Sequence, residues 1–237
     1  MKTGIMQPYF FPYIGYFQLI NAVDQFVLYD DVAYIKNGWI NRNQYLLNGI
    51  PKYFTLSLDG ASSFTPINLT YIQEDDKQKT KEKVLKTLGM AYSRAPFFKA
   101  VYGLIEEIIL NPDNNIASYN ECSIRQICDY LGIKTKIIVS SKIEKDGSLK
   151  GQDRVIEVCK RLETSTYFNA IGGKSLYASD IFEKNGLELK FLRPHLDRIT
   201  YKQFGAAFVP GLSIVDLIMF TPKDEAGTFL EEYSLEN

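Results

Sequence analysis

Apolar and polar positions at the start of the chain predict a strand, a helix and a second strand. A short apolar run at residues 4–6 ends in polar and turn residues, as strands commonly do. Residues 13–24 carry apolar side chains at the spacing of one helix face, namely Ile14, Phe17, Ile20 and Val23. The next apolar run, residues 25–31, ends in two aspartates and predicts another strand. Two strands joined by a helix are typical of a parallel sheet.

Turn and helix patterns replace this alternation in the middle of the chain. Residues 35–58 predict a loop and a hairpin, because Asn-Gly pairs, which favour tight turns, occur at 37–38 and 48–49. Residues from about 73 to 132 are then amphipathic at helical spacing, and predict helices at about 75–90, at about 96–110 and before Gly132.

The third of these helices has its own start signal. Ser118 and Glu121 have the spacing of a capping box, and Gly132 is placed to end the helix. The whole segment is therefore predicted to be a helical insertion or cap.

Strands and helices alternate again after this segment. The predicted strands lie at 134–141, 165–173 and 187–195, and the predicted helices at 152–162, 179–186 and 212–220. A polar tail is expected after the last helix. Residues 1–237 are therefore predicted to form a single Rossmann-like α/β domain, with a mostly parallel sheet and a helical insertion at about 73–132.

Composition narrows the classes of function. The chain has 27 basic and 28 acidic residues and a net charge of −1, so it lacks the basic excess on which non-specific nucleic-acid binding depends. Aromatic residues make up 14% of the chain, with 16 Tyr against a single Trp. Because Tyr combines an apolar ring with a hydroxyl group, this surplus favours a polar pocket for a small ligand.

The cysteines and apolar runs indicate a reduced compartment. The chain has three cysteines, Cys122, Cys128 and Cys159, an odd number whose spacing matches no metal or redox motif. We therefore expect them to be small buried side chains in a cytoplasmic protein. No run resembles a signal peptide or a membrane span, and no cluster of residues predicts a metal site. Assembly of the chain into a homo-oligomer is compatible with the sequence.

Polar, glycine or proline residues follow each strand predicted for the parallel sheet. They are Gln7-Pro8-Tyr9, Asp30-Asp31, Ser140-Ser141, Gly172-Gly173 and Arg193-Pro194-His195. Ligands of such sheets bind at the carboxyl ends of the strands, so we expect these segments to line one shared cavity. The alternative is that they are ordinary polar turns, because loops after strands are often polar.

The first of these segments is unusual in composition. "QPYFFPYIGYF", Gln7 to Phe17, combines two prolines with six aromatic rings, which suits the lip of a pocket, and we call it the proline–tyrosine segment. Gln7, Tyr9, Tyr13 and Tyr16 are therefore expected to contact the ligand. The alternative for Gln7 is that it caps a backbone group at the strand end.

Three further groups of residues could bind or react. Asp30 and Asp31 could accept a proton or bind sugar hydroxyls, or only begin a turn. Gly172 and Gly173 offer backbone N–H groups to a phosphate, although they lack the spacing of a dinucleotide motif. The loop 35–43 gathers candidates for a phosphate or sugar site, Lys36, Trp39, Asn41, Arg42 and Asn43, and a solvated hairpin would look similar.

His195 is the only histidine of the chain. A single histidine is more often structural than functional. This one follows a proline at the end of a predicted strand, where an ordinary imidazole pKa near 6.5 would suit a general base. We therefore take His195, Asp30 and Asp31 as the candidate catalytic residues.

Three long segments resemble one protein family. "MQPYFFPYIGYFQLINAVDQFVLYDDVAYIKNGWINRN" resembles the start of the WbqC-like family, and "TYFNAIGGKSLY" and "YKQFGAAFVPGLSIVDLIMF" resemble its later signature segments. Asn169, Gly172, Gly173 and Tyr177 fall in the second segment and Gln203 in the third. Ala33 stands where the family would have a polar residue, and His195 matches no family motif.

The resemblance implies work on an activated sugar. Members of the family occur among the genes for bacterial O-antigen, capsule and glycan assembly, so the implied ligand is a nucleotide-linked sugar. The residues expected to bind it are Gln7, Tyr9, Tyr13, Tyr16, Lys36, Trp39, Asn41, Arg42, Asn43, Asn169, Gly172, Gly173, Tyr177 and Gln203.

A second likeness concerns the helix start "PYIGYFQLI", which lies after a first strand much as H-x-G-H does in adenylyl- and cytidylyltransferases. Both histidines are replaced, and tyrosine cannot supply their positive charge to a phosphate. This replacement weakens the hypothesis of a nucleotidyltransferase.

The leading hypothesis is an N-acyltransferase that moves an acyl or aminoacyl group from a thioester to a nucleotide-linked amino sugar. The thioester would be carried by coenzyme A or an acyl carrier protein, and no tightly bound cofactor is expected. The alternatives are a non-catalytic protein that binds a sugar nucleotide or a carrier protein, and a nucleotidyltransferase relative that lacks the H-x-G-H histidines.

Overall fold

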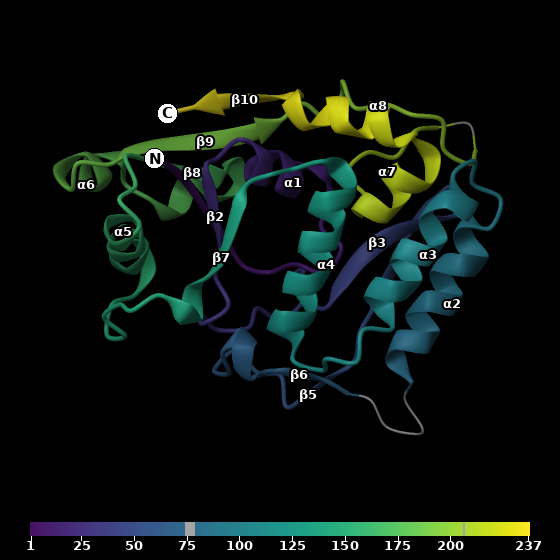
Figure 1. The fold of residues 1–237 in the computed structure, drawn as a ribbon, viewed down its shortest axis with the longest axis horizontal. Helices are drawn as coiled ribbons and strands as arrows, with labels where there is room; N and C mark the ends of the chain where they lie inside the picture. Colours follow the sequence, from purple (N-terminus) through teal and green to yellow (C-terminus); the bar gives the residue numbers. More distant parts are fainter. Residues whose placement is uncertain (74–78, 206) are drawn as a thin grey trace.

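A six-stranded sheet forms the centre of the molecule (Figure 1). The computed structural model describes residues 1–73, 79–205 and 207–237. The strands of the sheet are β1 (Lys2–Met6), β2 (Gln25–Leu28), β7 (Lys136–Val139), β8 (Thr166–Ala170), β9 (Glu188–Pro194) and β10 (Tyr233–Glu236). Their order across the sheet is β10-β9-β8-β1-β2-β7, and only β10 runs antiparallel to its neighbour. An α/β fold with a mostly parallel sheet is therefore confirmed.

Helices cover both faces of this sheet. Helix α1 (Ile14–Asn21) packs on one face, and α5 (Gly151–Arg161) and α6 (Ser179–Lys184) pack on the other (Figure 1). The sequence dictates this layering through alternation along each strand. In β2, Phe26 belongs to the core on the α1 side and Val27 to the core on the α5 side, and both are completely buried.

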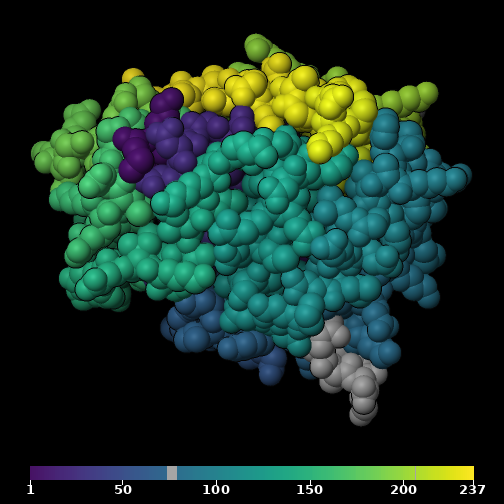
Figure 2. Space-filling view, in the orientation of Figure 1, coloured from purple at the N-terminus to yellow at the C-terminus, as the bar shows by residue number. Residues whose placement is uncertain are grey.

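The connection from β2 to β7 contains most of the remaining structure. It begins with a hairpin of β3 (Arg42–Leu47) and β4 (Ile50–Thr55). Asn48 and Gly49 both have positive φ at its turn, as the sequence predicted. The short strands β5 (Leu58–Asp59) and β6 (Tyr71–Ile72) follow, with the 3-10 turn η1 (Ile67–Leu69) between them. The segment that contains β5, η1 and β6 lies at the lower edge of the molecule in Figure 2.

Three helices occupy the rest of the connection: α2 (Thr80–Tyr92), α3 (Phe98–Ile109) and α4 (Ile116–Leu131). Residues 74–78, where the predicted helix at about 75–90 would begin, lie outside the described residues. The predicted capping box is wrong. Asn115 caps α4 instead, because its side chain accepts hydrogen bonds from the backbone N–H groups two and three residues later, while Ser118 lies inside the helix. Gly132 ends the helix with φ 79°, as predicted.

The end of the chain is more ordered than the predicted polar tail. Helix α7 (Ile214–Phe220) is followed by α8 (Lys223–Thr228), the 3-10 turn η4 (Phe229–Glu231) and β10, which pairs with β9. This segment also contacts the first helix, because the Gln18 amide donates hydrogen bonds to the carbonyl groups of Phe229 (2.8 Å) and Glu232 (2.9 Å). Its partners come from distant parts of the chain, so its local pattern carries little signal.

Among the described residues, no helix has the length and apolar character that crossing a membrane requires.

Candidate functional site

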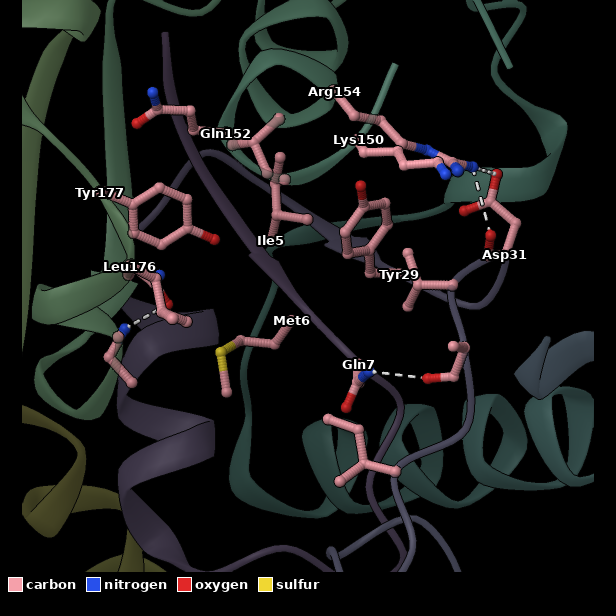
Figure 3. A pocket seen from close by; sticks show the side chains of 18 of the residues that line it. Ile5, Met6, Gln7, Tyr29, Asp31, Lys150, Gln152, Arg154, Leu176 and Tyr177 are labelled. Atoms are coloured by element: carbon pink, nitrogen blue, oxygen red, sulfur yellow. Dashed lines mark hydrogen bonds and ion pairs between the residues drawn. The ribbon is translucent and has the colours of Figure 1, made fainter. Parts of the chain in front are cut away.

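A cavity of about 850 Å³ opens at the carboxyl ends of β1, β2 and β8 (Figure 3). The start of α5 and the 3-10 turn η3 (Ile171–Leu176) complete its wall. From β1 the chain continues on one side to β2 and β7 and on the other to β8 and β9, so strand order reverses between β1 and β8. The carboxyl ends of strands at such a reversal are where ligands of open α/β sheets bind.

One end of the cavity carries positive charge. Asp31, which follows β2, forms an ion pair with Arg154 at 2.7 Å between the charged atoms (Figure 3). Lys145 forms a second ion pair with the same carboxylate, also at 2.7 Å. Lys150 lies beside Arg154 and also lines the cavity. Two cations and one carboxylate line this end, and Lys145 adds a further positive charge from behind Asp31, so this end has a net positive charge.

The ion pairs keep Asp31 ionised. Burial would raise the pKa of its carboxyl group, but the hydrogen bond from Lys145 and the charges of Lys145 and Arg154 outweigh that effect, and the pKa is lowered. A carboxylate with a lowered pKa is a weak general base near neutral pH. Asp31 is therefore the counter-ion of these cations and not a proton acceptor.

The start of α5 adds backbone donors to the same end. Its cap residue, Lys150, makes no side-chain capping bond, and the first N–H groups of a helix have no partner within the helix. Gly151 and Gln152 of this first turn line the cavity. Free N–H groups and the positive end of the helix dipole favour an anion, and phosphate groups are the usual case.

Neutral polar groups occupy the opposite wall. Gln7 follows β1, and its amide donates a long hydrogen bond of 3.4 Å to the Ala33 carbonyl. Asn169, near the end of β8, accepts a bond of 2.7 Å from the Ala170 N–H. A Cβ at Gly173 would lie 2.6 Å from the Asn169 amide nitrogen, so the glycine makes room for this side chain.

Two tyrosines flank the space between these walls (Figure 3). Burial raises the pKa of Tyr29 to about 12, although the charge of Arg154 opposes this shift. Burial also raises the pKa of Tyr177, whose hydroxyl lies 3.4 Å from that of Tyr167. Both phenols are therefore neutral near pH 7 and offer hydroxyl groups and ring faces to a ligand.

Six of the fourteen residues expected to bind the ligand line this cavity. Those present, with one candidate catalytic residue, are Gln7, Tyr9, Asp31, Asn169, Gly172, Gly173 and Tyr177. Three of the five predicted strand ends therefore meet at one edge of the sheet, and they bring together segments separated by up to 170 positions. The prediction is wrong for the other two, because Ser140-Ser141 and Arg193-Pro194-His195 do not line this cavity.

Other residues expected to bind the ligand make hydrogen bonds within the protein instead. Tyr16 is buried, and its hydroxyl donates to the Gln7 carbonyl at 2.9 Å. The Asn43 amide bonds two carbonyl groups of the proline–tyrosine segment, and the Asn41 amide bonds the Leu56 carbonyl. Gln203 is buried against Asp216. These side chains shape the segments around the cavity without lining it.

Tyr13 and part of the loop 35–43 also lie outside the cavity lining. The Tyr13 ring covers Gly15, where a Cβ would lie 2.5 Å from the ring. Lys36, Trp39 and Arg42 belong to the surface beyond Ile35, which is the member of this loop that lines the cavity.

The other two candidate catalytic residues are elsewhere. Asp30 points away from Asp31 and accepts bonds from the Ser141 N–H (2.8 Å) and hydroxyl (2.6 Å) beside a second cavity of about 250 Å³. The backbone N–H of His195 donates to the Glu232 carbonyl at 2.9 Å. His195 follows β9, and the end of β9 does not reach the main cavity. Neither side chain can act on a ligand held beside Asp31.

Sequence reasoning missed the cations. Lys145 and Lys150 lie in the connection between β7 and α5, and Arg154 lies in the first turn of α5. Basic residues on both sides of Gly151 at the start of a predicted helix were the available signal. Within residues 1–73, 79–205 and 207–237, no cluster of His, Cys, Asp and Glu has the arrangement of a metal site.

One comparison with known proteins identifies a family. The model of the WbqC-like protein family matches residues 7–227 of the chain. The "Uncharacterized protein Rv1507c" of Mycobacterium tuberculosis is 29% identical over 232 residues, which is 97% of each chain. No solved structure was found to match.

Proposed function

Because the chain belongs to the WbqC-like protein family, we propose that it is a transferase acting on a nucleotide-linked amino sugar in bacterial O-antigen, capsule or other glycan synthesis. One observation carries this proposal: a single cavity combines a cationic end with a neutral polar wall at the reversal of strand order. The strand order, 3-2-1-4-5-6 when the strands of the sheet are counted along the chain, supports a Rossmann-like assignment as well.

The two ends of the cavity suit the two parts of such a ligand. We place the diphosphate against Lys150, Arg154 and the start of α5, where charge-assisted hydrogen bonds are available. The amides of Gln7 and Asn169 then face the sugar, whose hydroxyl groups need both donors and acceptors. Cavities of this size suit ligands as large as sugar nucleotides.

The proposed reaction is acyl transfer to the amine of the sugar. The amine nitrogen attacks the thioester carbonyl carbon, the new C–N bond forms and the C–S bond breaks. The departing thiolate takes up the proton that the amine loses, so atoms and charge balance. Backbone N–H groups of Gly172 and Gly173 are the candidate donors to the oxyanion. Coenzyme A or an acyl carrier protein would supply the thioester.

One observation favours a second candidate, a non-catalytic sugar-nucleotide-binding protein. Asp31, the carboxylate that lines the cavity, is held in two ion pairs, and His195 lies elsewhere. A reaction in this cavity would have to proceed without either residue as its base.

Ligand binding tests the site directly. We expect a UDP- or dTDP-linked amino sugar to bind, UDP alone to bind more weakly, and the free sugar not to bind, as measured by calorimetry and by a rise in melting temperature. Arg154→Met should weaken the binding of the nucleotides by about tenfold or more, because a charge-assisted hydrogen bond is lost. Lys160→Met, on the last turn of the same helix, is the matched control.

Turnover separates the two candidates. Incubation with an amino-sugar nucleotide and acyl thioesters should add the mass of the acyl group to the sugar, as read by mass spectrometry. Tight binding without product for any donor would identify the non-catalytic candidate. Binding of nucleoside triphosphates but not of sugar nucleotides would reject both candidates and favour a nucleotidyltransferase.

A further inference from the structure

An exposed aromatic and basic surface lies beside the cavity. The Trp39 and Tyr53 rings are neighbours, with centroids 6.3 Å apart, and the Arg42 guanidinium lies 4.5 Å from the centre of the Tyr53 ring. Trp39 is 41% exposed and Tyr53 is 50% exposed, and Lys36 is exposed in the same loop. We call Lys36, Trp39, Arg42 and Tyr53 the aromatic–basic platform.

Backbone hydrogen bonds hold this platform in one conformation. The Arg42 side chain donates to the carbonyl groups of Asn37 and Gly38, which closes the loop on itself. The Trp39 carbonyl accepts a bond of 2.8 Å from the Phe10 N–H, which ties the loop to the proline–tyrosine segment. Tyr53 projects from β4 of the hairpin. Exposed rings on such a rigid support lose little entropy when a partner binds.

The composition of the platform is that of a protein-binding hot spot. Trp, Tyr and Arg are the residues most enriched at the centres of protein interfaces. The surrounding segment is also basic: residues 32–58 contain Lys36, Arg42 and Lys52 and no acidic residue, in a chain whose net charge is −1. Charge complementarity therefore favours an acidic partner.

The platform adjoins the rim of the cavity. Ile35 lines the cavity and is nevertheless 52% exposed, so it lies at the opening. The Gly38 N–H bonds the Ile35 carbonyl at 3.2 Å, which joins the rim and the platform in one turn. A partner seated on the platform would therefore be at the entrance of the cavity.

We propose that the aromatic–basic platform is the docking surface for an acidic acyl carrier protein, which presents its thioester to the cavity on a flexible arm. This inference rests on the proposed acyl transfer and selects the carrier protein over free coenzyme A as the donor. A nucleic acid would need a more extended basic surface than these few cations provide.

Binding of a carrier protein tests the platform without requiring turnover. The probe is a bacterial acyl carrier protein loaded with an acetyl group, titrated into the full chain by calorimetry at low ionic strength. We expect Trp39→Ala to weaken binding about tenfold, and Lys36→Glu to weaken it and reduce its dependence on salt. Met90→Ala and Lys86→Glu make matched changes on the exposed surface of α2 and should leave binding unchanged.

The outcomes separate the docking surface from the reaction. If wild type does not bind the carrier, or if Trp39→Ala and Lys36→Glu bind it as wild type does, the docking proposal is overturned, even when acetyl-coenzyme A supports transfer. If an oligonucleotide or an acidic glycan binds at the platform in place of the carrier, the proposal is also overturned. Carrier binding that depends on the platform supports it, even when no donor yields product and the proposed function fails.

Discussion

Replacing Asp31 with Asn should strengthen the binding of a nucleoside diphosphate while destabilising the fold. The carboxylate lies at the cationic end of the cavity, with Lys145 and Arg154 each at 2.7 Å. In the absence of ligand, the Asp31 carboxylate is the negative charge that Lys145 and Arg154 contact. A diphosphate at the same end must approach this negative charge, so removing the charge favours the ligand.

The magnitude follows from Coulomb's law. Two unit charges about 6 Å apart interact by roughly 3 kcal/mol at an effective dielectric constant near 20. The cavity is open to water, so we take about half of that value, and expect Asp31→Asn to bind UDP roughly tenfold more tightly.

The cost to stability follows from the same contacts. The Asp31 side chain is 16% exposed and that of Lys145 is 6% exposed, so the pair is largely buried. Removing one partner of a buried pair costs about 3–5 kcal/mol, and we expect about 2 kcal/mol because the amide keeps one hydrogen bond and Asp31 is not fully buried. Urea denaturation measures this loss.

Calorimetric titration of UDP at constant ionic strength tests the binding part of this prediction. Asp129→Asn removes the same charge from an exposed position on α4 and should leave the UDP affinity unchanged. If folded Asp31→Asn binds UDP more weakly than wild type, Asp31 serves to position Arg154 for the phosphates and the reasoning above is wrong.

Three further predictions concern stability. The pKa of Asp31 is lowered in the folded protein, so its ionised carboxylate adds to the free energy of unfolding above the ordinary carboxyl pKa near 4. This stabilisation is lost as pH falls through the pKa of the folded protein, and denaturation curves of wild type and Asp31→Asn should therefore converge in acid. Gly4→Ala should cost about 1–3 kcal/mol in chemical denaturation, because the new Cβ would lie 2.9 Å from the buried Phe26 ring in the neighbouring strand. Tyr92→Phe should cost about 1–3 kcal/mol in the same assay, since it removes a hydrogen bond of 2.9 Å to the buried Asp216 carboxylate, and an unchanged midpoint would mean that water replaces the hydroxyl.

The local pattern of the chain predicted most of the secondary structure. Alternating and helical spacing located the parallel strands and the helices between them, because each element buries one face against its neighbours. The antiparallel strand β10 was missed, since its partner β9 lies about 40 positions earlier and the segment itself looks polar. Strand order was also beyond reach, because no local signal states which strands become neighbours.

The same limit explains which site residues were found. Gln7, Asp31 and Gly173 follow the strands β1, β2 and β8, which are neighbours in the sheet, and their segments meet. His195 follows β9, which lies one strand farther out, so its position at a strand end did not bring it to the cavity. Asp30 and Asp31 are adjacent in the chain, and adjacent residues of an extended segment point to opposite sides.

The bonds from Gln18 to Phe229 and Glu232 have a consequence for synthesis of the protein. The first helix is made early, yet its buried amide finds these partners only when residues 229–232 have left the ribosome. Until then the nascent chain exposes the apolar surface that this late segment covers, and chaperones that shield such surface would have their main opportunity. Arrest of translation upstream of residue 229 should therefore leave a ribosome-bound chain that proteases cut readily, whereas the released protein resists them.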